Sequence, residues 1–187
     1  MKLKKDEVRF KILMAAKQEF FTNGYLDANM RSIATKANIT PGNIYRYYAS
    51  KEELLDAIVG GVNKALTTIT KLESVVPSTI ISNSKLLINY FINTALDYAI
   101  KNKYETIILL SKSQGSKYEH CADDFIKMTA KSIDNSSSNK NMDLAMILAE
   151  TVIHGESMII KNYIDDEEKI KSLSLDFLQT IFASYIK

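Results

Sequence analysis

Apolar residues recur every three or four positions along most of the chain, which is the spacing of one face of an α-helix. This periodicity predicts helices over about 5–22, 29–37, 40–48, 52–72, 85–104, 106–111, 118–133, 142–163 and 167–186. Segments rich in Ser, Thr, Asn, Pro or Gly lie between them, and residues 74–84 and 134–141 are expected to be loops. Six Gly and two Pro in 187 residues also argue against a turn-rich β fold. The fold class is therefore expected to be all-α.

The second and third predicted helices are short and lie close together. A helix over 29–37 is followed by Asn38, which tolerates a positive φ and can make a tight turn. Thr40 and Pro41 suit the N-cap and the first position of the next helix, which is expected to end near Tyr48. Two short helices joined by a three-residue turn, after a longer supporting helix, form a helix-turn-helix unit.

Two further signals mark the borders of this unit. Gly24 is suited to the left-handed conformation that ends a helix, so the supporting helix is expected to stop there. Ser50 and Glu53 have the spacing of a capping box, which predicts the start of a fourth helix. We therefore expect a DNA-binding domain of three helices over 1–51 and a larger helical bundle over 52–187.

Charge is distributed unevenly over the same border. Residues 1–51 contain ten Lys or Arg and four acidic residues, a net charge of +6, and the rest of the chain carries −4. A basic amino-terminal quarter favours a polyanionic partner for that segment. Charge alone leaves open a chance distribution of solvated surface lysines.

The same segment carries a family signature. The runs ILMAAKQEFFTNGY, residues 12–25, and IATKANITPGNIYRYYASKEELL, residues 33–55, resemble the amino-terminal signature of TetR-type transcriptional repressors. The sequence departs from the family pattern at Ala28-Asn29, where Thr or Ser is usual, at Asn38, which replaces a common Gly, and at Pro41. The resemblance implies a homodimeric regulator that binds a palindromic site on double-stranded DNA.

The chemistry of the third predicted helix agrees with this role. Thr40, Pro41 and Gly42 are small, so this end of the helix can approach base edges in a major groove about 12 Å wide. Asn43 can bond an adenine edge, and tyrosine hydroxyls on the flanks can reach phosphates on the groove walls. The residues expected to contact DNA are Arg31, Thr40, Pro41, Gly42, Asn43, Tyr45, Arg46, Tyr47 and Lys51.

Some of these assignments keep alternatives open. Arg31 can reach either a guanine or a phosphate, and Arg46 is either solvated or in contact with the DNA backbone. Ile44 and Tyr48 are expected to be core residues that hold the helix on its neighbours. Lys51 begins the fourth helix, where its ammonium and the free backbone N–H groups together favour a phosphate.

The last two predicted helices carry more apolar surface than one small core requires. The surplus favours burial against a second copy of the chain in a two-fold four-helix interface, although the same stripes can also pack within one chain. The residues expected at a dimer interface are Leu148, Val152, Ile159, Phe177, Ile181 and Tyr185.

In TetR-type regulators the carboxy-terminal helices typically enclose a pocket for a small-molecule effector. The resemblance therefore implies such a pocket here, with aromatic or titratable groups on otherwise apolar helices as candidates. These are Tyr90, Tyr98, Tyr104, His120 and His154. Each histidine can equally be a hydrogen-bonded core or interface residue, and His154-Gly155 can mark a close helix crossing at the dimer axis.

Other functional classes lack their sequence signals. His120-Cys121 has too few companions for a metal site, since only one further His and no further Cys exist. The chain has no phosphate-cradling Gly loop and no nucleophile elbow, so we expect neither an enzyme nor a cofactor. A single Cys suits the reducing cytoplasm, and no uncharged apolar run is long enough to span a membrane.

The sequence thus predicts a cytoplasmic, homodimeric, ligand-responsive repressor that releases a palindromic operator when a small molecule binds its carboxy-terminal domain. Two alternatives remain: a helical carrier or enzyme with no DNA role, and a dimeric DNA binder without effector control.

Overall fold

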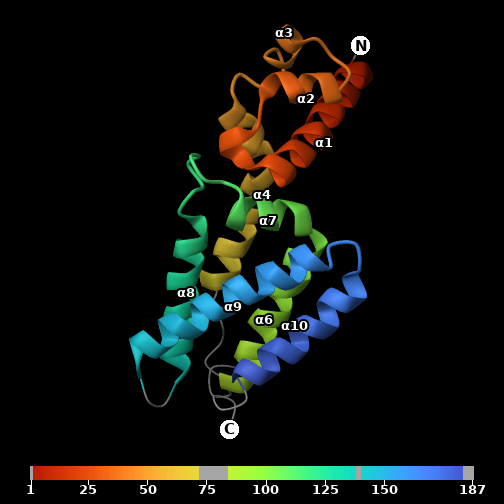
Figure 1. Ribbon diagram of the computed structural model, residues 1–187. Helices are drawn as coiled ribbons and strands as arrows, with labels where there is room; N and C mark the ends of the chain where they lie inside the picture. The colour runs from red at the N-terminus through yellow and green to blue at the C-terminus, as the bar shows by residue number, and fades with distance from the viewer. Residues whose placement is uncertain (1, 72–83, 138–139, 183–187) are drawn as a thin grey trace. The chain divides into compact units, whose positions relative to one another are not determined.

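A computed structural model describes residues 2–71, 84–137 and 140–182, and all regular structure within these ranges is helical (Figure 1). The side chains of residues 84–92 are not described. The helices are α1 (Lys2–Asp27), α2 (Met30–Lys36), α3 (Pro41–Ile44), α4 (Lys51–Lys71), α6 (Ser84–Lys101), α7 (Lys103–Ser111), α8 (Cys121–Ser136), α9 (Met142–Asn162) and α10 (Glu167–Phe182). The expectation of an all-α fold is confirmed. The loop expected over 74–84 lies almost wholly outside the described residues.

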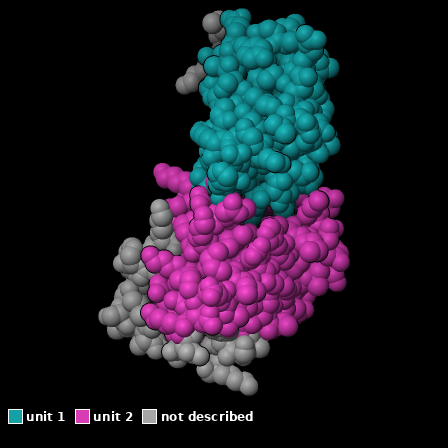
Figure 2. Space-filling view, turned by 60° about the vertical axis from the view of Figure 1, so that its left-hand side comes forward, with its two compact units in different colours: residues 1–63, 104–120 teal, residues 64–103, 121–187 magenta. Residues whose placement is uncertain are grey.

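The chain forms two compact units, each with its own core (Figure 2). Unit 1 contains Met1–Asn63 and Tyr104–His120, and unit 2 contains Lys64–Lys103 and Cys121–Lys187. The packing units therefore differ from the domains expected from the sequence, because the first turns of α4 and the segment 104–120 pack with the amino-terminal helices. Whether function divides at residue 51 stays a prediction.

Gly24 interrupts α1 where the sequence predicts an end. Its φ of 76° and ψ of 168° are not helical, and a short final turn follows to Asp27. The backbone at this point lies in a region that residues with a side chain rarely occupy. The N–H of the next residue, Tyr25, then donates to the carbonyl of Lys112 at 2.7 Å, so the break turns this N–H toward the segment 104–120.

The turn between α2 and α3 forms as predicted, but α3 is shorter than predicted. Asn38 has a φ of 57°, and Thr40 takes the extended N-cap conformation although its side chain makes no capping bond. Only four residues of α3 are helical. The N–H groups of Arg46 and Tyr47 bond to carbonyls three residues back, at 3.1 and 3.0 Å, so the chain tightens into turns before Tyr48.

A single core holds the helix-turn-helix unit together. The apolar stripe of α1 meets buried residues of α2, α3 and α4, and none of these side chains is more than slightly exposed. The residues are Ile12, Ala16, Phe20, Ile33, Ala34, Ile44, Tyr48, Leu54 and Leu55. The capping box predicted at the start of α4 is present, since Ser50 Oγ accepts from Glu53 N at 3.0 Å and Glu53 Oε2 accepts from Ala49 N at 2.7 Å.

Unit 2 is built from the later helices. Helices α8 and α9 are joined by a short connection and pack side by side, and α10 packs on α9 and α6 (Figure 1). The inner face of α10 carries Ile170, Ser174, Leu178 and Phe182. Gly155 of α9 lies against the ring of Phe177, because a Cβ at this glycine would collide with the ring. The close crossing considered for His154-Gly155 is therefore a crossing of α9 and α10 within one chain.

Two glycines in unit 1 provide a matched stability test. Gly24→Ala is expected to lower the free energy of unfolding by about 1 to 3 kcal/mol, because alanine is strained at this backbone conformation. Gly61→Ala places the same methyl group on an exposed position of α4 with nothing within 4 Å. This change is expected to raise the free energy of unfolding by about 0.5 to 1 kcal/mol. Urea unfolding followed by circular dichroism compares the two. Equal effects would contradict the strain assigned to Gly24.

Candidate nucleic-acid interface

The α3 helix and the turn after it divide their residues between core and surface. Ile44 and Tyr48 are buried, Asn43 and Tyr47 are half-buried, and the remaining predicted contacts on this stretch are exposed. Those exposed residues are Thr40, Pro41, Gly42, Tyr45 and Arg46. Tyr45 has 54% of its surface exposed, which is high for an aromatic side chain. The anchoring predicted for Ile44 and Tyr48 is confirmed by their burial.

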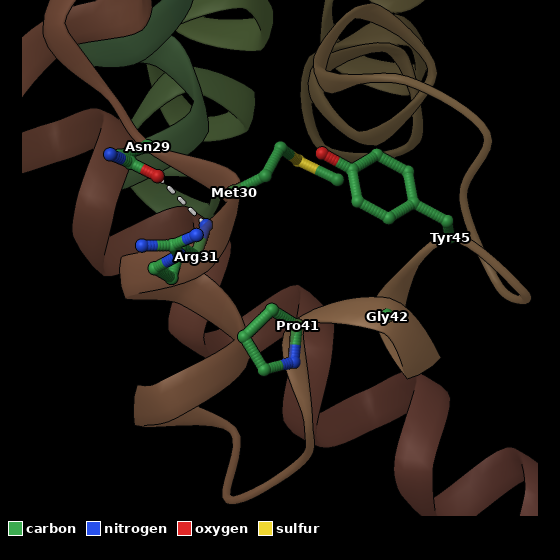
Figure 3. A pocket seen from close by; sticks show the side chains of 6 residues that line it. All are labelled: Asn29, Met30, Arg31, Pro41, Gly42 and Tyr45. Atoms are coloured by element: carbon green, nitrogen blue, oxygen red, sulfur yellow. Dashed lines mark hydrogen bonds between the residues drawn. The ribbon is translucent and has the colours of Figure 1, made fainter.

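The beginning of α3 is narrow and open to solvent. A Cβ added at Gly42 would meet nothing within 4 Å, so the protein itself leaves the space before this residue free. A hollow of about 450 Å³ lies between the starts of α2 and α3 and is lined by six residues (Figure 3). They are Asn29, Met30, Arg31, Pro41, Gly42 and Tyr45. In Figure 3 the Met30 side chain extends toward the Tyr45 ring.

A second, wider hollow of about 750 Å³ shares Asn29, Met30 and Tyr45 with the first and extends to the start of α4 at Ser50 and Lys51. Five of the predicted contacts therefore line one recessed surface made of the two hollows, namely Arg31, Pro41, Gly42, Tyr45 and Lys51. The other four, Thr40, Asn43, Arg46 and Tyr47, line neither hollow. We call this surface the reading face, and define it by the residues that line the two hollows.

The start of α2 is fixed by a side-chain cap. Asn29 Oδ1 accepts a hydrogen bond from Arg31 N at 2.8 Å, so Asn serves the capping function for which Ser or Thr is also suited (Figure 3). The departure from the family pattern at this position therefore keeps the helix start intact. The cap also places Arg31 in the first turn of α2 with an exposed side chain.

The side chain of Glu19 on α1 forms hydrogen bonds with α2. Its carboxylate is almost fully buried and accepts from Ser32 Oγ at 2.9 Å and from Lys36 Nζ at 2.7 Å. Burial alone raises the pKa of the Glu19 carboxyl, but the bonds from Lys36, Ser32 and the N–H of Asn29 outweigh it and lower the pKa below its ordinary value. The carboxylate is thus charged at neutral pH and fixes the orientation of α2 on α1.

Lys51 has a structural role that sequence reasoning missed. Its ammonium donates to the carbonyl oxygens of Tyr25, Leu26 and Ala28 at 2.6, 3.1 and 3.0 Å. It also lies 4.5 Å from the centroid of the Tyr25 ring. An ammonium has three donors, so these carbonyls at the end of α1 use all of them. The phosphate contact expected of Lys51 stays a prediction, and it requires the ammonium to give up at least one of these bonds.

The basic charge of the amino-terminal segment is partly neutralised within unit 1. Lys11 pairs with Glu7, Lys17 with Glu105, and Lys36 with Glu19. Within the described residues, no ion pair involves the guanidinium of Arg31 or Arg46. The guanidinium groups of Arg31, on the reading face, and Arg46, at its edge, are therefore available to bind an anion.

The segment 104–120, here called the docking segment, packs in unit 1 through polar contacts with α1 and α4. Glu52 links the two sides: its Oε2 accepts from Tyr25 Oη at 2.7 Å and its Oε1 accepts from Lys117 N at 3.1 Å. Burial and the neighbouring Glu52 carboxylate raise the pKa of Tyr25 to about 12. The Tyr25 hydroxyl therefore remains a donor throughout the neutral range.

A second carboxylate on α4 repeats this arrangement one turn later. Asp56 pairs with Lys117 Nζ at 2.5 Å and accepts from Tyr118 Oη at 2.5 Å. Hydrogen bonds from Lys117 and Tyr118 lower the pKa of the Asp56 carboxyl. Gly60, the next turn along, allows the close approach, since a Cβ there would lie 3.3 Å from the Tyr118 hydroxyl. Sequence reasoning missed the docking segment because its partners lie 62 to 88 positions away.

The five residues expected in an effector pocket belong to both compact units. Tyr104 packs edge-on against Phe21 in unit 1, and His120 is largely exposed beside Glu119. His154 is exposed on α9, whereas Tyr98 is half-buried on α6. The side chain of Tyr90 lies outside the described residues. The effector pocket expected from this set stays a prediction.

The residues expected at a dimer interface differ in burial, and their place in an interface stays a prediction. Val152 is buried within the chain, Leu148, Ile159, Phe177 and Ile181 are half-buried, and Tyr185 lies outside the described residues. Met142, the first residue of α9, is an exposed apolar residue. So are Leu144, Ile147 and Met158, of which Ile147 and Met158 each expose 61% of their surface.

Thr151 and His154 are exposed and continue the spacing of three and four between Leu144, Ile147 and Met158. Together the five residues form what we call the α9 stripe, and Leu175 of α10 is a further exposed apolar residue. The α9 stripe escaped sequence reasoning because Thr151 and His154 interrupt its apolar pattern.

Among the described residues, no group of three or more His, Cys, Asp or Glu is placed to hold a metal ion. No helix in the described ranges has both the length and the apolar content needed to cross a membrane.

The amino-terminal segment is similar to known regulators in sequence. A family model described as "Bacterial regulatory proteins, tetR family" matches residues 12–58. The HTH-type transcriptional regulator UidR of Escherichia coli is 37% identical over 59 residues, which are 32% of this chain and 30% of UidR. The HTH-type transcriptional activator FasR of Mycolicibacterium smegmatis is 36% identical over 77 residues, covering 37% of this chain and 35% of FasR. The match thus spans about a third of each relative.

Similarity of fold extends over nearly the whole chain. A TetR family transcriptional regulator from Chloroflexus aurantiacus superimposes with a TM-score of 0.63 at 14% identity, covering 97% of this chain and 88% of that one. At this level of identity the likeness is one of fold alone.

A substitution at Lys51 separates its two roles. Lys51→Met keeps most of the aliphatic stem and removes the three bonds to α1, so we expect the free energy of unfolding to fall by about 1.5 to 3 kcal/mol. DNA binding by the folded variant, measured at low temperature, should keep the wild-type dependence on salt. If the slope of the logarithm of affinity against the logarithm of salt concentration is instead smaller by about one, Lys51 contacts a phosphate.

Proposed function

We propose that this chain, which belongs to the tetR family of bacterial regulatory proteins, binds double-stranded DNA as a homodimer and regulates transcription. The observation that carries the proposal is the division of the α3 stretch: Ile44 and Tyr48 fix it in the core, while its narrow start and Tyr45 stand exposed on a recessed face. A surface that fits a major groove needs both properties, because an unanchored helix cannot hold a register and a buried one cannot reach bases.

The contacts follow from where each side chain lies. Arg31 and Asn43 border the start of α3 and are assigned to base edges, with Thr40 and Pro41 against a thymine methyl and Gly42 allowing close approach. The side chains that follow in the sequence are assigned to phosphates.

Tyr45 and Tyr47 supply hydroxyls to phosphates, and Arg46 supplies a guanidinium. Phosphate contacts of this kind set the register, and the base contacts carry the sequence information. Lys51 acts mainly through the structure that it holds together.

The α9 stripe is the surface on which we place the second copy. Its apolar side chains are exposed in one chain, and a two-fold pairing of α9 and α10 with their symmetry mates would bury them. A two-fold protein matches a palindromic operator whose half-sites lie about 34 Å apart, one turn of the duplex.

Effector control is assigned to the docking segment. The chain leaves unit 2 after Lys103, packs in unit 1 from 104 to 120, and returns to unit 2 at Cys121. Both ends of the docking segment are therefore joined through the polypeptide chain to unit 2, in which we place effector binding. A ligand that favours another conformation of unit 2 would act on the Glu52 and Asp56 contacts and reorient the reading face. Release of the operator on ligand binding makes the protein a repressor.

Selection of oligonucleotides from a random pool tests the DNA proposal as a whole. Recovery of an inverted repeat with half-sites one helical turn apart is the expected result. Recovery of single half-sites would leave DNA binding in place and contradict the paired arrangement, and recovery of no shared sequence would contradict sequence-specific binding.

Tyr45→Phe removes one hydroxyl from the reading face and leaves the ring. We expect affinity for the operator and for unrelated DNA to fall about 3- to 10-fold alike, as one phosphate hydrogen bond is worth about 0.5 to 1.5 kcal/mol. Fluorescence anisotropy with both DNAs measures this. Tyr163→Phe, an identical change at an exposed position just after α9, serves as the control and should have no effect. If the affinity falls for the operator but not for unrelated DNA, Tyr45 contacts a base.

Ile147→Glu tests the α9 stripe. A carboxylate in the middle of an apolar interface is expected to weaken dimerisation by about 2 kcal/mol or more, which is about 30-fold in Kd. Analytical ultracentrifugation over a dilution series measures the shift. Lys131→Glu, at an exposed site of α8, is the control for added negative charge. A dimer unchanged in Ile147→Glu would place the interface on another surface.

A further inference from the structure

The inner face of α9 contains one half-buried acid, Glu156, whose Oε1 atom is buried and which the preceding roles leave unexplained. Ala149, Val152 and Ile160 of this face are buried, and Glu156 lies among them at the same helical spacing. Across the α9–α10 crossing it meets Ser174, the polar member of the buried face of α10, which is 0% exposed. One carboxyl and one hydroxyl thus face each other inside an apolar layer of unit 2.

The carboxyl group is only half satisfied. Its Oε2 accepts a hydrogen bond from Ser174 Oγ at 2.6 Å. Its Oε1 is buried and has no hydrogen-bond partner among the described residues. No ion pair involves Glu156 in the described part of the chain. A buried carboxylate without a counter-charge is costly, so this oxygen has a strong intrinsic tendency to bind a proton or a donor.

A second copy packed on the α9 stripe, as proposed above, does not supply the donor. His154 and Met158 of the α9 stripe are each two positions from Glu156, and two positions correspond to about 200° around a helix. Glu156 therefore points away from the α9 stripe and into its own unit. The donor must come from within unit 2 or from a molecule bound there.

Two further groups at the same crossing suit a cation. The ring of Phe177 lies against Gly155, the residue before Glu156, and Ser174 is one turn before Phe177 on α10. A carboxylate, a hydroxyl and an aromatic ring are the groups that bind an ammonium or amidinium in a water-poor site. The surrounding Ala and Ile side chains suit an apolar tail.

We propose that Glu156 Oε1 is the acceptor for the positively charged, N–H-donating head of an amphiphilic small molecule, with Ser174 orienting the carboxylate and Phe177 flanking the head. This inference rests on the proposed function in one respect, since it identifies that molecule as the effector. The effector class is then an amine or amidine with an apolar body.

Protonation is the competing way to satisfy the same oxygen. Burial raises the pKa of the Glu156 carboxyl above its ordinary value, and the Ser174 hydrogen bond offsets this only in part. A group with a raised folded-state pKa stabilises the fold most below its unfolded pKa, and that stability is lost as pH rises through the folded value. Glu156→Gln, which is neutral at every pH, should therefore melt higher than the wild type at pH 8 and nearly the same at pH 4.5.

Three probes with one tail separate ligand binding from protonation. 4-Phenylbutylamine, 4-phenylbutanol and 4-phenylbutyrate share the aromatic chain and carry a positive, a neutral and a negative head. We expect the amine to bind the wild-type dimer most tightly at pH 8 by calorimetry, and its affinity to fall about tenfold or more in Glu156→Gln. The alcohol should bind both proteins alike, and the butyrate should bind neither.

Glu150→Gln is the matched control, because it makes the same change at an exposed site of α9. Amine binding that is equal in the wild type and in Glu156→Gln overturns the proposal. So does the absence of amine binding combined with the expected pH-dependent difference in melting, which would make Glu156 a proton-binding group only. If the wild type binds operator DNA but no amine, only this inference is contradicted. If it binds the amine but no DNA, the proposed regulatory function is contradicted.

Discussion

The constraint on which this structure depends is that its reading helix is too short to exist alone. The four helical residues of α3 form about one turn, and helices of that length are unstable in water without tertiary support. Ile44 and Tyr48 provide the support by entering the core between α1, α2 and α4. The position of every side chain on the reading face is therefore set by the packing of unit 1, and changes elsewhere in that unit alter the reading face.

Several polar anchors extend this support at both ends of the helix-turn-helix unit. Glu19 fixes α2 on α1, and Lys51 binds the carbonyls that end α1 beside the start of α4. Glu52 and Asp56 then attach the docking segment to the same turns of α4. Each anchor is a charged group whose partners are fixed, which gives the unit defined orientations that apolar packing alone specifies less well. The half-buried Glu156 of α9, whose buried Oε1 is unmatched, stands apart from this pattern.

Local signals allowed much of the first unit to be predicted from the sequence. Asn38 and the Ser50–Glu53 capping box act through the backbone of their own neighbourhood, and they have the predicted positive φ and the predicted bond from Glu53 N to Ser50 Oγ. Gly24 has a positive φ, but its ψ of 168° is not the left-handed helical conformation that was predicted. The length of α3 was overestimated because residues 45–47 belong to tight turns that periodicity cannot distinguish from helix. The docking segment and the role of Lys51 depend on contacts between distant positions, which no local pattern contains. The same limit explains why Tyr98 and Tyr104, six positions apart, were grouped although they join different units.

Unit 1 is not a continuous stretch of sequence, because the chain passes between the units after residues 63, 103 and 120. A fragment ending after α4 would leave Tyr25, Glu52 and Asp56 facing water where Lys112, Lys117 and Tyr118 now lie. Unit 1 therefore cannot be transplanted onto another body as a simple amino-terminal module. Any functional chimera of this protein has to bring a compatible copy of residues 104–120 with it.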